Sequence, residues 1–237
     1  MAEAPQALET RQRTVRLMAR ALGRNGLSGP FGHCSVRLDA DHFLVCASRP
    51  MAMIAPGEAG TVVPVRGPLP EGVLGEVRIH QQVYQRRPEI GAVCRFLSPQ
   101  IMALAALGLT PQARHGFGSY VAPAVPFWTD PQLVRNDTAA EGVAELMGNA
   151  PALVLNINGA VTAAPTPAQA LGLAWLLEDS ARVELTVRSI APDAAPLATD
   201  QARQRATWSG GIAERLWDYL TRDDPEGPFM PPSMPPT

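Results

Sequence analysis

The chain of 237 residues, with a formal net charge of −2 and 46% hydrophobic residues, has the size and composition of one globular domain. The near-neutral charge is unlike the basic surface that nucleic-acid binding requires, and no apolar run approaches the roughly 20 residues of a membrane span, so neither partner is expected. All 20 basic residues other than histidine are arginine, which excludes Schiff-base and pyridoxal-phosphate chemistry because both need a lysine amine.

In chain order, the apolar periodicity first predicts an amphipathic helix over 7–24, which Asn25-Gly26 ends with a turn signal. Strands and helices then alternate in small groups, and this order predicts an α/β fold. The expected elements are strands over 33–38, 43–47 and 61–65, a helix over 75–86, a strand over 90–97, helices over 99–107 and 138–148, a strand over 152–157, and helices over 168–189 and 199–221.

The two ends of the chain and its cysteines predict the domain boundaries and the compartment. Residues 225–237 are rich in proline and have little apolar alternation, so we expect a domain over 1–224 followed by a disordered tail. The first residues lack the charged and then apolar pattern of a signal peptide. Cys34, Cys46 and Cys94 are odd in number and lack the spacing of a metal knuckle. We therefore expect free thiols in the cytoplasm.

Side-chain alternation in the strand over 90–97 predicts which residues face a pocket. Arg95 and Leu97 point to one face of the strand, whereas Cys94 and Phe96 point to the other. We expect Arg95 and Leu97 to line a pocket. Cys94 is expected in the core, where it has no catalytic role.

Several motifs together resemble the class II aldolase/adducin family, and most closely its decarboxylase-like branch. Their order and spacing carry the resemblance, which covers nearly the whole chain. The motifs are Gly32-His33-Cys34-Ser35-Val36-Arg37-Leu38, the helix pattern of Glu76, His80, Tyr84 and Arg87-Pro88-Glu89, the strand-like segment from Val154 to Val161, and the pair Glu178 and Arg182.

The resemblance implies a three-layer αβα fold with a central, mainly antiparallel sheet flanked by helices. It also implies a homo-oligomer, namely a tetramer of fourfold symmetry in which each pocket crosses a subunit boundary. The aromatic and proline residues of 117–131 would suit such a boundary, but they could equally form a loop folded into the domain.

A divalent metal site is part of the same resemblance, with metal-binding histidines at positions 95, 97 and 158. This chain has Arg95, Leu97 and Asn158 there. A guanidinium is a permanent cation with no lone pair to donate, leucine offers no ligand, and asparagine offers one neutral oxygen. We therefore expect no metal and no other cofactor.

Two residues are the catalytic candidates in the pocket that the resemblance implies. Glu76 stands at the position of the family's acid–base carboxylate and would move a proton. Arg95 would replace the metal by holding developing negative charge, because a guanidinium grips carboxylates through two parallel hydrogen bonds. The candidates for binding a small anionic organic substrate are His33, Ser48, Arg49, His115 and Asn158.

Two kinds of function remain open on these residues. The leading hypothesis is a metal-independent carbon–carbon lyase, of the decarboxylase or retro-aldol type, in which Glu76 and Arg95 do the chemistry. The alternative is a catalytically degenerate binding or scaffold protein, as in the adducin head, where Arg95 merely forms a salt bridge with Glu76. In either case His80 is expected to be a structural histidine inside the fold.

Overall fold

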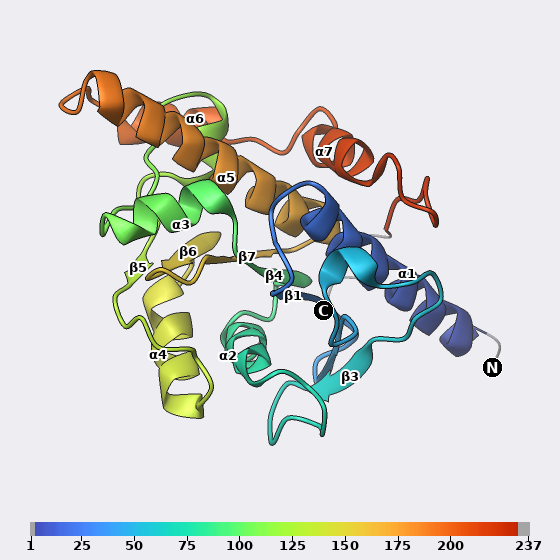
Figure 1. The fold of residues 1–237 in the computed structure, drawn as a ribbon. Helices are drawn as coiled ribbons and strands as arrows, with labels where there is room; N and C mark the ends of the chain where they lie inside the picture. Colours follow the sequence, from blue (N-terminus) through green and yellow to red (C-terminus); the bar gives the residue numbers. More distant parts are fainter. Residues whose placement is uncertain (1–2, 232–237) are drawn as a thin grey trace.

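A seven-stranded sheet forms the centre of the fold in the computed structural model, which describes residues 3–231 (Figure 1). The strands lie in the order β3-β2-β1-β4-β7-β6-β5. Within these residues, neighbouring strands pair antiparallel except for β5 and β6, which are parallel. The strands are β1 (His33–Arg37), β2 (His42–Val45), β3 (Thr61–Pro64), β4 (Ala92–Phe96), β5 (Phe127–Trp128), β6 (Ala152–Leu155) and β7 (Ala160–Ala164).

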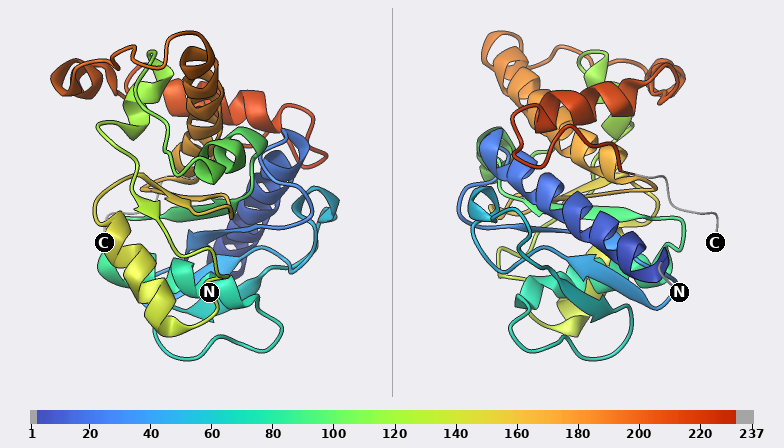
Figure 2. Two further views of the ribbon diagram at one scale, coloured as in Figure 1. Left: turned by 60° about the vertical axis from the view of Figure 1, so that its left-hand side comes forward. Right: turned by 90° about the vertical axis from the view of Figure 1, so that its right-hand side faces the viewer.

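Helices cover both faces of this sheet (Figure 2). On one face lie α1, α3, α5 and α7, and on the other lie α2 and α4. The α-helices are α1 (Glu3–Arg24), α2 (Arg78–Arg86), α3 (Pro99–Ala106), α4 (Asp137–Met147), α5 (Pro167–Ile190), α6 (Thr199–Arg205) and α7 (Ile212–Thr221), with 3-10 turns η1 (Met51–Met53), η2 (Gly75–Val77) and η3 (Phe117–Val121).

Each face of the sheet buries its own apolar cluster. Leu17 of α1 and Leu171 of α5 pack with Cys94 on one side, and Val83 of α2 packs with Val93 on the other. The alternation of β4 therefore runs as predicted, with Cys94 in the core between sheet and helices. This arrangement confirms the three-layer αβα fold with a mainly antiparallel sheet.

Some elements differ from the sequence expectations. The helix expected over 199–221 is two helices: α6 ends at Arg205, and Gly210 and Gly211, with positive φ angles of 73° and 71°, lie outside helical geometry directly before α7. The short strands β5 and β7 were not predicted. β7 has the sequence Ala-Val-Thr-Ala-Ala, whose alanines have low strand propensity, and it is held between β4 and β6 by its backbone pairing.

Residues 225–231, expected to begin a disordered tail, instead pack along α1. Glu226 accepts hydrogen bonds from Arg16 and Arg20 of that helix, and the guanidinium of Arg13 lies 4.3 Å from the ring centre of Phe229. The carbonyl of Phe229 also accepts from the indole N–H of Trp217 in α7. The tail prediction is thus wrong for this part, and residues 232–237 lie outside the described residues.

Among residues 3–231, every helix is either too short or too polar to cross a lipid bilayer. The three cysteines of the chain are buried and unpaired with one another.

Candidate active site

Three chain segments bring Glu76, Arg95 and Asn158 into contact. Glu76 lies in η2, directly before α2, and its carboxylate is 3.2 Å from a terminal guanidinium nitrogen of Arg95 in β4. The side-chain amide of Asn158 donates to the same carboxylate at 3.3 Å. The Arg95 side chain is only 2% exposed, whereas that of Glu76 is 16% exposed. The carboxylate is therefore held at the border between the interior and the solvent.

Arg95 is a buried cation with hydrogen-bonding capacity to spare. Burial lowers its pKa, while the carboxylate of Glu76 opposes that shift, and a guanidinium remains charged at neutral pH. Its Nε–H is buried and has no hydrogen-bond partner among the described residues. A group of this kind can bind a substrate anion beside Glu76.

Asn158 is placed by the tight turn that joins β6 to β7. In this turn Ile157 adopts a φ of 47°, which is unfavourable for a β-branched residue. Gly159 follows with a φ of 77°, and a Cβ there would lie 2.0 Å from the carbonyl oxygen of Phe96. Only glycine therefore lets the turn press onto the end of β4, and this close approach brings Asn158 to Glu76.

His33 lies beside Arg95 because the two residues are paired neighbours in the β1–β4 ladder. Its Nδ1 is 2.8 Å from Nε2 of His80, and its own Nε2 is buried without a partner among the described residues. Burial lowers the pKa of His33 well below its usual value, and the charge of Arg95 lowers it further. His33 is consequently neutral at physiological pH.

A small cavity of about 10 Å³ adjoins His33, with room for about one water-sized group. Ser48 and Thr61 are among its lining residues, and Leu74 and Val77 border it from the segment that carries Glu76. The structure therefore places His33 and Ser48 at one cavity, next to the Glu76 segment.

Two of the predicted substrate-binding residues lie elsewhere. Arg49 is exposed and forms an ion pair of 3.1 Å with Glu58, so it does not line this cavity. His115 is 2.8 Å from Asp179 of α5 and lines a different, open cavity with Gln201 and other residues. Within the described chain, Arg49 and His115 therefore do not line the cavity beside the Glu76 segment, and their role in binding a substrate stays a prediction.

His80 and Cys94 have surroundings that suit structural residues. Burial lowers the pKa of His80 to about 3, with the charge of Arg95 contributing, so its ring is neutral. Burial raises the pKa of Cys94 to about 12, which leaves its thiol protonated and unreactive.

The donor set around Glu76 does not fit a divalent metal. Among residues 3–231 no three His, Cys, Asp or Glu side chains lie close enough together to hold a metal ion. The nearest charged neighbour of Glu76 is the guanidinium of Arg95, which would repel a cation. The side-chain amide of Asn158 already donates a hydrogen bond to the carboxylate of Glu76.

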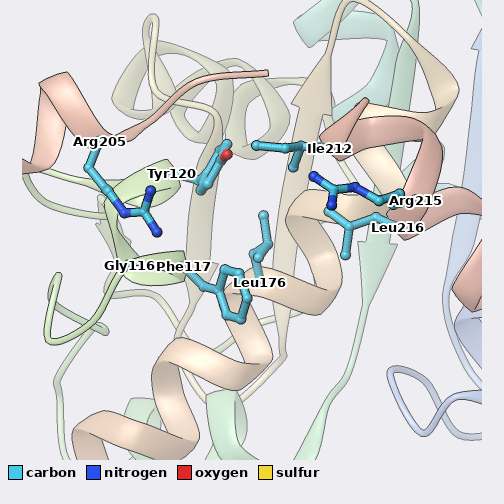
Figure 3. A pocket seen from close by; sticks show the side chains of 8 residues that line it. All are labelled: Gly116, Phe117, Tyr120, Leu176, Arg205, Ile212, Arg215 and Leu216. Atoms are coloured by element: carbon cyan, nitrogen blue, oxygen red, sulfur yellow. The ribbon is translucent and has the colours of Figure 1, made fainter. Parts of the chain in front are cut away.

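A separate cavity of about 430 Å³ opens between η3, α5, α6 and α7, and sequence reasoning missed it (Figure 3). Arg205 and Arg215 stand on opposite sides of this cavity, with Phe117, Tyr120 and the apolar side chain of Leu176 between them. It has no carboxylate or histidine in its lining. It therefore lacks the acid–base group that makes the surroundings of Glu76 the better candidate for catalysis.

The seven-stranded sheet with helices on both faces defines an α/β protein with the fold of the class II aldolases. The chain belongs to the class II aldolase and adducin N-terminal domain family, whose profile matches residues 13–185. The fold is similar to that of the L-fuculose 1-phosphate aldolase from Glaciozyma antarctica PI12, with a TM-score of 0.75 and 19% identity over 94% of this chain and 92% of that one.

Two relatives are each named 3,4-dihydroxyphthalate decarboxylase. The protein from Arthrobacter keyseri is 30% identical over 196 residues, which are 74% of this chain and 77% of that one. The protein from Rhodococcus jostii (strain RHA1) is 27% identical over 189 residues, 71% and 76% of the two chains. Decarboxylases and aldolases both break carbon–carbon bonds, and this kinship assigns the chain to the lyases.

Proposed function

We propose that the protein is a metal-independent decarboxylase of a small hydroxylated aromatic carboxylate. The contact between Glu76 and Arg95 carries this proposal, because it sets a partly exposed acid–base carboxylate against a buried permanent cation. The names of the two relatives support the substrate class.

In the proposed reaction, the partly exposed carboxylate of Glu76 takes up a proton from water and then donates it to the ring carbon that bears the substrate's carboxylate. The bond from that carbon to the carboxylate carbon then breaks, its electron pair returns to the ring, and carbon dioxide leaves. Each turnover consumes one proton, which Glu76 regains from water through its partly exposed side chain. These reaction steps use no oxidant, reductant or cofactor.

Arg95 holds the substrate's anionic oxygens in this scheme. Its unpartnered Nε–H is available for them, and the guanidinium charge stabilises negative charge on the ring oxygens during the reaction. Asn158 adds a neutral amide at the same place. His33 and Ser48 contact the substrate from the small cavity beside the Glu76 segment.

One observation favours a second candidate. Arg95 is already paired with Glu76, and a pair of this kind would also close the pocket of an inactive binding or scaffold subunit. Retro-aldol cleavage is a variant of the lyase proposal that uses the same two residues, with Glu76 taking a hydroxyl proton.

The decisive experiment offers 3,4-dihydroxyphthalate, simpler dihydroxybenzoates and aldol-type sugar acids to the purified protein after treatment with a chelator. Release of carbon dioxide from an aromatic acid supports the proposal, and release of an aldehyde from a sugar acid supports the retro-aldol variant. If no compound is turned over with or without added divalent metal, the scaffold candidate replaces the lyase.

A further inference from the structure

A chain of hydrogen bonds runs from Tyr84 to the cavity at His33 through the layer between the sheet and α2. The hydroxyl of Tyr84 is 2.9 Å from that of Ser35, and the Ser35 hydroxyl is 2.6 Å from Nδ1 of His80. Nε2 of His80 is 2.8 Å from Nδ1 of His33. All four side chains are buried.

Both imidazoles in this chain are neutral, so each carries a single N–H. Burial lowers the pKa of His33 and His80, and the guanidinium of Arg95 lowers both further. The direction of the hydrogen bonds is therefore a question of which ring nitrogen holds the proton.

The four side chains carry four hydroxyl and ring N–H protons but share three hydrogen bonds, so one proton is always left over, and where it lies decides that question. Ser35 and Tyr84 have two hydroxyl protons, and they make two hydrogen bonds, one between themselves and one to Nδ1 of His80. If the Nδ1 of His80 accepts, both protons are used. If it donates, the proton left over is on a hydroxyl in the interior, with no acceptor among the described residues. If it accepts, the proton left over is on Nε2 of His33, a residue that lines a cavity with room for a water-sized group, and this difference favours acceptance by about tenfold or more.

His80 therefore carries its proton on Nε2 and donates it to Nδ1 of His33. Because Nδ1 of His33 accepts, the proton of that neutral ring must be on Nε2. The Nε2 of His33 is the atom that is buried without a partner, on a residue that lines the small cavity with Ser48.

We infer that Ser35 and His80 are positioning residues that fix His33 as a neutral Nε2–H donor, so that the site recognises an uncharged or anionic oxygen of its ligand at the cavity. The role of this donor toward substrate rests on the proposed function. The same assignment removes the Nε2 lone pair of His33 as a proton acceptor, so proton transfer is left to Glu76.

Tyr84 contributes less than Ser35 to fixing the tautomer of His33. Its ring is held by the guanidinium of Arg37, 4.6 Å from the ring centre, and by the ring of Phe43 at 4.9 Å. If the Tyr84 hydroxyl is removed, the Ser35 hydroxyl still donates its proton to Nδ1 of His80. The tautomer should therefore depend on the Ser35 hydroxyl and not on the Tyr84 hydroxyl.

The test is nuclear magnetic resonance of the full-length protein labelled with ¹⁵N in its histidines, in the absence of ligand. The correlations of ring protons to each nitrogen distinguish the two neutral tautomers and the imidazolium. We expect His33 and His80 both as Nε2–H tautomers at neutral pH. A proton on Nδ1 of His33, or an imidazolium at either residue, would overturn the inference.

Two matched variants sharpen the result. Ser35→Ala is expected to give a mixture of tautomers at His33, whereas Tyr84→Phe is expected to leave the Nε2–H form at His33 and His80. Equal spectra from the two variants would contradict the role of Ser35. The measurement needs no substrate, so a failed decarboxylase assay would leave its outcome intact.

Discussion

The guanidinium of Arg95 and the carboxylate of Glu76 lie 3.2 Å apart, with one side chain almost fully buried and the other partly open to solvent. The pairing is asymmetric, because Arg95 has a further unpartnered N–H whereas Glu76 also accepts from Asn158. The pair therefore leaves Arg95 with a buried donor that Glu76 does not use.

Replacing Arg95 by alanine should lower turnover of the aromatic acid by about a hundredfold to a thousandfold, as expected for the loss of one charge-stabilising group. Arg66→Ala is the matched control, since Arg66 is exposed and lies outside the site. The rate of carbon dioxide release measures both. Equal rates for the two variants would show that the cation is not part of the chemistry.

The variant Glu76→Gln keeps the shape of the side chain and its ability to accept from Asn158, but it cannot move a proton. We expect turnover to fall by about a hundredfold to ten thousandfold, with the circular dichroism spectrum unchanged. Glu71→Gln, at an exposed position, should behave as wild type. Full activity of Glu76→Gln would place the acid–base group elsewhere.

The purified protein should hold no stoichiometric divalent metal, because a guanidinium stands beside the carboxylate of Glu76. Elemental analysis after gentle purification gives the metal content. About one zinc, manganese or iron per chain, together with loss of stability on chelation, would contradict this prediction.

Acid should weaken the contact between the C-terminal segment and α1. Burial raises the pKa of Glu226, but hydrogen bonds from Arg16 and Arg20 outweigh it, so the pKa lies below the ordinary value of 4.5. A lowered folded-state pKa stabilises the protein above the unfolded-state value, and this contribution is lost as the pH falls through the folded-state pKa.

Glu226→Gln should therefore reduce the free energy of unfolding by about 3 kcal/mol at pH 7, and the difference from wild type should shrink below about pH 4. Urea unfolding of both proteins at several pH values measures it. A difference that is constant with pH would mean that the charge of Glu226 is not responsible.

The protein is predicted to form a homotetramer, the assembly that the family resemblance implies. His115 and Phe117 lie apart from Glu76 in this chain, and Phe117 is exposed, so this region is free to meet another copy. Light scattering at micromolar concentration decides the matter, and a stable monomer would refute the prediction.

The alternation of strands and helices was sufficient to predict an α/β fold, and the strand period predicted the faces of β4. The three layers were predicted from the resemblance to the class II aldolase/adducin family. The same resemblance, carried by the order of the motifs, brought Glu76, Arg95 and Asn158 into one candidate pocket. His115 could not be located in this way, since its position depends on an irregular loop and on its contact with Asp179.

Other features needed three dimensions. Ser35 shares a strand face with His33 by simple alternation, which was a usable signal, but its bond to His80 depends on how α2 crosses the sheet. The C-terminal contact joins Arg20 to Glu226, which are 206 positions apart. Composition alone showed that the segment is rich in proline. It could not show which carboxylates pair with the arginines of α1.

The same long-range contact sets an order of events for folding. At about 5–20 residues per second, the 206 positions between Arg20 and Glu226 take about 10–40 s to synthesise. Throughout this time α1 carries the inward-facing Arg16 and Arg20 without their C-terminal carboxylates. The contacts of Arg16 and Arg20 with Glu226 therefore form only after residue 226 has been synthesised.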